Sequence, residues 1–118
     1  MHYLEILPET SERSCELTVR WFLMEYLCDY GLDISIIHKD LSKEGVVGWC
    51  LQIDDSEFEI EIEESLTGDE YTKTLLHELY HVYQHMTGQM QCEICAGFME
   101  NLLLDKYSKT NSNLLCQV

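Results

Sequence analysis

The chain has 118 residues, the length of a single domain, and 46% of them are apolar, which is enough to form a hydrophobic core. Its 22 acidic residues outnumber seven basic ones, giving a formal net charge of −15 that argues against nucleic acids and anionic membranes as partners and favours basic proteins or peptides. No apolar run is long enough to span a bilayer and the start carries no secretory signal, so we expect one cytoplasmic domain over residues 1–118.

The first third of the chain predicts a short strand followed by a helix. The strand is HYLEIL, and Pro8, the only proline, separates it from the helix. Apolar residues recur at steps of three and four between residues 11 and 30, which is the period of a helix. Gly31 stands where a helix would end in a left-handed residue.

Three strands are expected in the middle of the chain. LDISIIHKDL and GVVGWCLQIDD are rich in β-branched or aromatic residues, and the SKEG between them suits a short hairpin. The third strand, SEFEIEIEE, alternates strictly and places Phe58, Ile60 and Ile62 on one face. Its other face carries Glu57, Glu59, Glu61 and Glu63. These glutamates indicate either a solvated face, which also discourages edge-to-edge pairing, or a rim that selects basic substrate segments.

The clearest predicted helix covers residues 67–86. Thr67 and Glu70 fit a capping box at its start, and Gly88 ends it. An apolar stripe runs along one face at helical spacing and consists of Leu75, Leu79, Val82 and Met86. This stripe predicts that one face of the helix packs on the sheet while the opposite face borders a cleft.

A last helix is expected over about residues 91–107, with Ile94, Phe98 and Leu102 on one face. Residues 108–118 are polar and are expected to be loosely ordered. The whole order of elements predicts an α+β fold: an N-terminal helix, a three-stranded antiparallel meander and two C-terminal helices.

Two histidines on the clearest helix form a candidate metal site. His77 and His81 are four residues apart, so they share a face and are separated by about 6 Å of rise. Both imidazoles can therefore reach one ion, and Glu78 stands where a carboxylate can reach a water on that ion. This is the H-E-x-x-H arrangement of zinc hydrolases. The alternative is an amphipathic helix that happens to be rich in histidine.

The third ligand must come from another segment, and Glu93 is the best candidate. His85 is excluded as a ligand, because positions 77 to 85 span about 12 Å of rise. It is expected to be a surface residue or, like Tyr83 and Tyr107, a residue that supports the ligands. Gly88 reverses the chain, and Ala96 and Gly97 are small enough to let the returning helix approach closely. The alternative for Glu93 is an ordinary acidic residue favoured at a helix N-terminus.

The cysteines allow a competing metal site. Cys15, Cys28 and Cys50 are expected to be buried thiols, since no secretory signal favours disulfides. Cys92 and Cys95 could join the two histidines in a closed Cys₂His₂ zinc site, which has no open position for hydrolysis. Packed thiols on the flanks of the helix are the simpler interpretation. No βαβ context supports a redox role for this C-x-x-C.

The segments HELYHVYQHMTG and CEICA resemble the zincin metallopeptidases, particularly the small SprT-like and phage-type minimal members. The resemblance covers residues 57–100, and the matching positions are His77, Glu78, His81, Gln84, Glu93 and Ala96. It implies a zincin-like core and, for a phage-encoded chain, a location in the host cytoplasm. The metzincin pattern is absent, since neither its glycine nor its third histidine follows His81.

The sequence thus predicts a zinc-dependent peptidase. Zinc held by His77, His81 and Glu93 would lower the pKa of a water and polarise the scissile carbonyl, with Glu78 as general base. The residue that stabilises the oxyanion is left open among Tyr80, Tyr83, His85 and Tyr107. The expected substrate is a protein or peptide, with basic segments favoured by the charge. The alternatives are a non-catalytic zinc-binding regulatory module and an acidic decoy that mimics nucleic acid.

Overall fold

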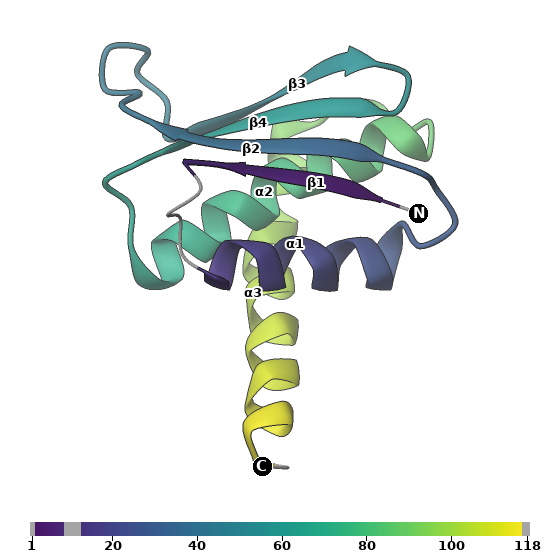
Figure 1. Cartoon of the computed structure of the whole chain (residues 1–118), viewed down its shortest axis with the longest axis vertical. Coiled ribbons are helices and arrows are strands. Elements are labelled where there is room, and N and C mark those ends of the chain that lie inside the picture. Colours follow the sequence, from purple (N-terminus) through teal and green to yellow (C-terminus); the bar gives the residue numbers. More distant parts are fainter. Residues whose placement is uncertain (1, 9–12, 117–118) are drawn as a thin grey trace.

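The computed structural model describes residues 2–8 and 13–116 and has the α+β architecture that the sequence predicts. Four strands form one sheet, and all three helices lie on one side of it (Figure 1). In chain order the elements are β1 (Tyr3–Leu7), α1 (Arg13–Tyr26), β2 (Asp33–Lys39), β3 (Gly48–Asp54), β4 (Glu57–Glu63), α2 (Gly68–Met86) and α3 (Glu93–Cys116). Within the described residues, no helix has the length and apolarity that crossing a membrane requires.

The sheet is mixed, so the predicted three-stranded antiparallel meander is wrong. The strand order is β1-β2-β4-β3, with β1 parallel to β2, β2 parallel to β4, and only β3 antiparallel to its neighbour β4. β2 and β3 are therefore not the two arms of a hairpin. The physical reason is burial: Phe58, Ile60 and Ile62 of β4 are all fully buried, whereas β3 is mostly exposed. β4 takes the interior position, and β3 becomes an edge strand.

The hydrophobic core lies between the inner face of the sheet and helices α1 and α2. Each of its large apolar side chains contributes roughly 1.5–3 kcal/mol by leaving water. The fully buried members include Phe22, Leu27, Ile34, Ile36, Phe58, Ile60, Ile62, Leu75, Leu76 and Leu79. The apolar stripe of α2 thus packs on the sheet, as predicted, and its opposite face is left for the candidate site.

Helix α1 is shorter than the predicted span of 11–30. It ends at Tyr26, and a turn follows in which the Tyr30 N–H donates to the Leu27 carbonyl at 3.1 Å. Gly31 is not left-handed, so the predicted helix end at that glycine is wrong. Residues 11 and 12 lie outside the described residues.

Helix α2 lacks the predicted capping box. Thr67 is the N-cap residue and has an extended backbone, but its side chain makes no capping hydrogen bond. The Glu70 carboxylate is instead directed along the helix, 3.8 Å from Lys73 Nζ. Instead of a capping box, the start of α2 has two acidic residues in its first turn, Asp69 and Glu70, whose negative charges interact favourably with the helix dipole.

The other end of α2 terminates as the sequence predicts. Gly88 has a φ of +75°, and its N–H donates to the carbonyl of His85. The next N–H, of Gln89, donates to the carbonyl of Gln84 at 2.8 Å. This pair of bonds is a Schellman motif, which requires a left-handed residue that glycine adopts without strain. It reverses the chain and returns α3 against α2.

Helix α3 is longer and differently oriented than predicted. It continues to Cys116, so the tail expected to be loose is helical as far as that residue; residues 117 and 118 lie outside the described part of the chain. Ile94, Phe98 and Leu102 do share a face, but that face points to solvent, with exposures of 86%, 69% and 52%. The opposite face carries Ala96, Leu103 and Tyr107, which are the buried residues of α3 as far as residue 110, where the description of side chains ends.

The glutamate row of β4 is only partly solvated. Glu57 is exposed, but Glu61 is buried and accepts hydrogen bonds from Trp49 Nε1 and from Lys39 Nζ. Glu63 accepts from the backbone N–H of Leu41 at 2.7 Å. All these positions lie on the sheet face away from the helices, so the row does not form the rim of a cleft beside α2.

Candidate metal centre

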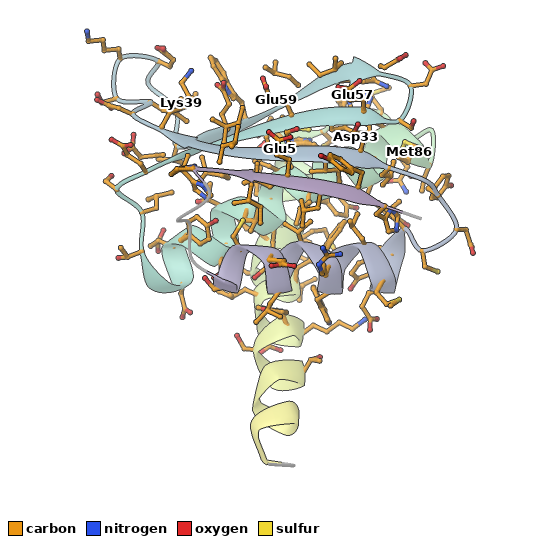
Figure 2. The ribbon with its side chains drawn as sticks, viewed as in Figure 1. Glu5, Asp33, Lys39, Glu57, Glu59 and Met86 are labelled. Atoms are coloured by element: carbon orange, nitrogen blue, oxygen red, sulfur yellow. The ribbon has the colours of Figure 1, made fainter. Side chains whose placement is uncertain are left out.

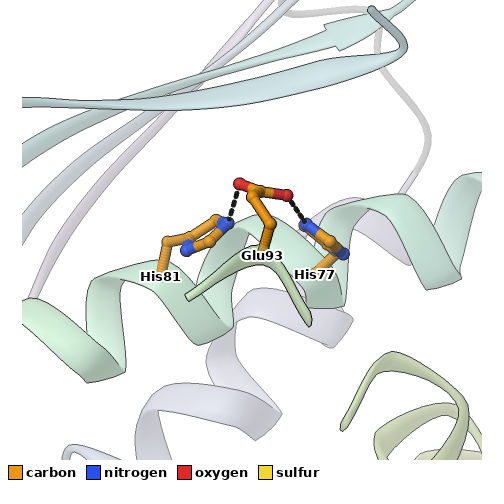
Figure 3. Close-up of side chains that lie close together, drawn as sticks. All are labelled: His77, His81 and Glu93. Atoms are coloured by element: carbon orange, nitrogen blue, oxygen red, sulfur yellow. Dashed lines mark hydrogen bonds and ion pairs between the residues drawn. The ribbon is translucent and has the colours of Figure 1, made fainter. Parts of the chain in front are cut away.

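Three side chains from α2 and α3 converge on one point (Figure 3). Glu93 Oε2 lies 3.0 Å from His77 Nε2, and Glu93 Oε1 lies 2.7 Å from His81 Nε2. One ligand atom from each residue lies within 4.8 Å of the other two, which is close enough for all three to bind one ion. Within the described part of the chain, His77, His81 and Glu93 are the single group with this property.

His77 is oriented by a carboxylate from α3. Its Nδ1 lies 2.6 Å from Glu100 Oε2, and the Glu100 side chain is 22% exposed. A carboxylate can only accept, so Nδ1 carries the proton in this bond. In a neutral ring that leaves Nε2 with its lone pair directed at the centre. Carboxylate–histidine pairs of this kind fix the ring and make it a stronger ligand.

His81 is oriented by an amide that is itself fixed from both sides. Its Nδ1 lies 2.9 Å from Gln84 Oε1, and Gln84 is almost fully buried. Gln84 Oε1 also accepts from the Cys92 N–H, and Gln84 Nε2 donates to the Cys92 carbonyl, each at 3.4 Å. These backbone contacts define which end of the amide is the oxygen. His81 Nδ1 must therefore donate, and its Nε2 also presents a lone pair.

The three ligand atoms fit a cation. When both rings are neutral, two nitrogen lone pairs face a carboxylate, and these acceptors repel one another unless a positive charge lies between them. His81 Nε2 is buried and, despite its 2.7 Å approach to Glu93, makes no hydrogen bond of acceptable geometry. A buried polar atom without a partner is costly, so this nitrogen is a natural metal ligand. A proton or a metal ion would satisfy the group.

The pKa values at the centre reflect this shared positive charge. Burial lowers the pKa of His77, but the hydrogen bond to Glu100 and the charge of neighbouring carboxylates outweigh it, so the net pKa is raised. Burial raises the pKa of Glu93, yet its contacts with the two histidines dominate and the net pKa is lowered. A metal ion at the centre would therefore compete with protonation of His77.

Glu78 lies in the wall of the same cleft and is 5% exposed. Burial raises its pKa to about 7, although the two histidines act in the opposite direction. The close approach depends on Gly48 of β3: a Cβ there would lie 3.3 Å from Glu78 Oε2 and 3.0 Å from Thr74 Cγ2. Glycine at this position lets the edge strand pack directly on α2.

The centre opens into a cleft of about 750 Å³ between β3, α2 and the start of α3. Its walls include the three candidate ligands and the first half of β3, from the preceding loop to Cys50. Glu70 and Lys73 lie farther along α2 on the same wall. The volume is in the range of small-molecule and peptide sites.

The residues predicted as partners of the ligands or as oxyanion donors lie elsewhere. None of His85, Tyr83, Tyr80 and Tyr107 lines the cleft. His85 packs against Phe58 with 5.7 Å between ring centroids, and Tyr80 stacks on Tyr83 at 5.5 Å. Tyr107 is buried against Trp21. These positions do not support the predicted oxyanion role. The step from 77 to 83 turns the Tyr83 side chain away from the ligand face, and His85 lies about 12 Å of rise beyond His77.

The cysteines do not form the competing site. Neither Cys92 nor Cys95 belongs to the metal-binding group, so the Cys₂His₂ alternative finds no support in the geometry. Cys92 precedes α3, and its sulfur accepts from the Cys95 N–H at 3.2 Å, as an N-cap would. Cys15 is buried, as predicted, whereas Cys50 is only half-buried. Desolvation raises the pKa values of the two thiols to about 11 and about 12. Cys28 is exposed, so its predicted burial is wrong.

Glu100 is the functional residue that sequence reasoning missed. A signal for it exists: it follows Glu93 by seven residues, two turns of a helix, so both carboxylates face α2. Comparisons with known proteins add no assignment, since no family model, curated protein or solved structure matches the chain. The function must therefore be argued from the site itself.

Proposed function

We propose that the protein is a zinc-dependent peptidase. The observation that carries the proposal is the convergence of His77, His81 and Glu93 beside the buried carboxylate of Glu78 in an open cleft. Three protein ligands with a remaining open position are typical of catalytic zinc sites, whereas structural sites have four. The order of elements, with a helical H-E-x-x-H and a third ligand on the returning helix, supports a zincin-like core.

Zinc suits this ligand set better than other common ions. Two imidazoles and one carboxylate are ligands that zinc accepts at about 2.0–2.2 Å, while calcium and magnesium prefer oxygen alone. Both rings already have the tautomer that zinc binding needs, because Glu100 and Gln84 each take the Nδ1 proton. The centre is thus arranged for the ion in advance.

The proposed chemistry divides between the ion and the chain. Zinc, when bound, supplies a Lewis acid that lowers the pKa of water and polarises a carbonyl. Glu78 accepts a proton from the attacking water and passes it to the leaving amine. In the metal-free protein, burial raises the pKa of Glu78 to about 7, which brings this carboxyl toward the range in which one group can both accept and donate a proton near neutral pH. Its burial also keeps bulk water from competing for the proton.

A peptide substrate can be held by the edge of β3. This strand pairs with β4 on one side, and its other edge has no strand partner among the described residues. An extended peptide can add there by backbone hydrogen bonds, which places its carbonyl groups over the cleft. The substrate is then recognised first as an extended backbone and second by the side chains that enter the cleft.

The test uses one carboxylate variant and a matched control. Glu78→Gln should retain zinc and lose peptide cleavage by about 10²–10⁴-fold, measured on a diverse peptide library by mass spectrometry. Glu70→Gln removes another carboxylate of the same cleft and should keep most of the activity. If zinc-loaded wild type cleaves no more than Glu78→Gln does, the peptidase proposal fails and a non-catalytic zinc-binding module takes its place.

A further inference from the structure

The outer face of the sheet is left uncovered by the fold. All three helices lie on the opposite side (Figure 1), so the outward side chains of four strands form one open surface. The strand register defines it. Trp49 and Leu51 of β3 and the odd-numbered residues of β4 point outward, because Gly48, Cys50 and Gln52 pair with the inward Ile62, Ile60 and Phe58. The register shifts between Gln52 and Asp54, and Asp54 pairs with Glu57. The same register places Tyr3, Glu5 and Leu7 of β1 on this face, opposite the outward residues of β2.

The centre of this surface is a group of four carboxylates, from Glu5, Asp33, Glu57 and Glu59 (Figure 2). Asp33 is directly opposite Glu57, and Ser35 lies between Glu5 and Glu59. Among the side chains that the structure describes, no cation lies within ion-pair distance of these four carboxylates. Lys39, which lies on the same face, pairs instead with Glu61 at 3.3 Å. Like charges on directly opposite residues destabilise a sheet. The fold therefore keeps an arrangement that costs it stability.

Apolar side chains flank the carboxylates on both sides. On β3 these are Trp49 and Leu51, which are 36% and 42% exposed, and on β1 they are Tyr3 and Leu7, which are 61% and 37% exposed. The Trp49 ring is held in place by its Nε1 hydrogen bond to Glu61. A sheet face that presents a fixed aromatic ring and aliphatic residues to water is typical of an interaction surface.

We propose that this face binds a cationic segment of another protein, one that carries lysine or arginine together with apolar residues. Charge complementarity selects this occupant: basic side chains would pair with the four carboxylates, and apolar ones would cover the β3 flank. A second copy of the chain is repelled, because each copy has a net charge of −15. Nucleic acids and anionic membranes are repelled for the same reason. The four carboxylates lie across the sheet from the helices (Figure 1) and do not line the cleft of the metal centre, although Trp49 borders both the surface and the cleft.

The probe is a labelled peptide rich in lysine and leucine, with a glutamate-for-lysine counterpart, and binding is followed by fluorescence anisotropy at increasing salt. The tested variant combines Glu5→Gln, Asp33→Asn, Glu57→Gln and Glu59→Gln. The control removes four other exposed carboxylates through Asp29→Asn, Glu44→Gln, Asp55→Asn and Glu64→Gln. Since each exposed ion pair is worth up to severalfold, the tested variant should lose about tenfold or more in affinity, and the control clearly less.

Three further readings make the result decisive. The tested variant should unfold at a higher temperature than wild type, because like-charge repulsion is relieved, which shows that lost binding is not lost folding. Leu51→Thr should weaken binding without changing its salt dependence. His81→Ala, which removes a candidate ligand, should bind the peptide as wild type does. The proposal is overturned if the control loses as much affinity as the tested variant, if wild type does not distinguish the two peptides, or if binding depends on His81.

Discussion

The two histidines of the candidate centre are held in different ways. A charged carboxylate holds His77 and changes its basicity, whereas a buried neutral amide holds His81 and fixes its position. His77 donates to the carboxylate of Glu100 at 2.6 Å, and both residues line the cleft. His81 donates to a neutral amide, Gln84, which is almost fully buried and bonded to the backbone of Cys92. The contact with Glu100 therefore raises the basicity of the His77 ring. The contact of His81 with Gln84 is a structural connection that joins α2 to the start of α3.

The largest effect is expected from removing the ligands themselves. His81→Ala and His77→Ala should each abolish stoichiometric zinc binding, a loss greater than the roughly 10–100-fold expected for a residue that only supports a ligand. Zinc content after dialysis and calorimetric titration measure it. If either variant retained the zinc affinity of the wild type, the substituted histidine would not be a ligand, and the comparison between the two histidines would fail.

Substitutions of Glu100 and Gln84, which orient the two histidines, should distinguish the roles of the two histidines more clearly than substitutions of the ligands do. Glu100→Gln and Gln84→Ala should both weaken zinc binding by about 10–100-fold. At a pH above the folded pKa of His77, where the pair with Glu100 no longer adds stability, only Gln84→Ala should also lower the free energy of unfolding of the metal-free protein, by about 1–3 kcal/mol. The reason is that this variant leaves the Cys92 N–H without its partner and removes one of the two donors to the Cys92 carbonyl. Denaturant unfolding measures this term. Equal stability losses in both variants would contradict the distinction.

A larger residue at Gly48 should affect both histidines together, because it would push β3 away from α2, the helix that carries them. Gly48→Ala should destabilise the protein by about 1–3 kcal/mol and reduce peptide cleavage, because the new Cβ meets Thr74 and Glu78. Gly97→Ala is the control: its Cβ meets nothing within 4 Å, and alanine should stabilise α3 by roughly 0.5–1 kcal/mol. Thermal unfolding compares them, and a neutral Gly48→Ala would show that the close approach is not needed.

The smallest expected effect is on the pH dependence of stability and of zinc affinity. It concerns only His77 and its partner Glu100. The pKa of His77 is raised in the folded metal-free protein, so its pair with Glu100 contributes stability below the unfolded value of about 6.5 and loses that contribution as pH rises through the folded pKa. Zinc affinity should show the opposite trend and rise over the same interval, because the ion competes with the proton. In Glu100→Gln the midpoint of the zinc profile should move to lower pH. An unchanged midpoint would mean that Glu100 does not set the basicity of His77.

Local pattern was sufficient to predict the part of the centre that lies on one helix. The spacing of His77, Glu78 and His81 defines their common face, and Gly88 indicates the reversal that brings Glu93 back. The same reasoning predicted the apolar stripe of α2 correctly. These features depend on helical geometry and on one left-handed glycine, both of which are encoded within a few residues.

The features that could not be predicted depend on contacts between distant segments. The insertion of β4 between β2 and β3 follows from comparing the burial of whole strands, which periodicity within one strand does not reveal. Helix α3 packs through Ala96, Leu103 and Tyr107, so Ile94 and Phe98 point outward although their spacing suggested a packing face. Gln84 was noted only through a resemblance, and its bonds to Cys92 became visible in three dimensions.

The most direct test of the proposed centre is X-ray absorption at the zinc edge of the zinc-loaded protein. Two imidazole nitrogens and a Glu93 carboxylate should give a shell of nitrogen and oxygen at about 2.0–2.2 Å, with no sulfur at about 2.3 Å. The spectrum should be unchanged when Cys92 and Cys95 are both replaced by serine. A sulfur shell that disappears in this double variant would show that the cysteines hold the ion, and would contradict the proposed catalytic centre.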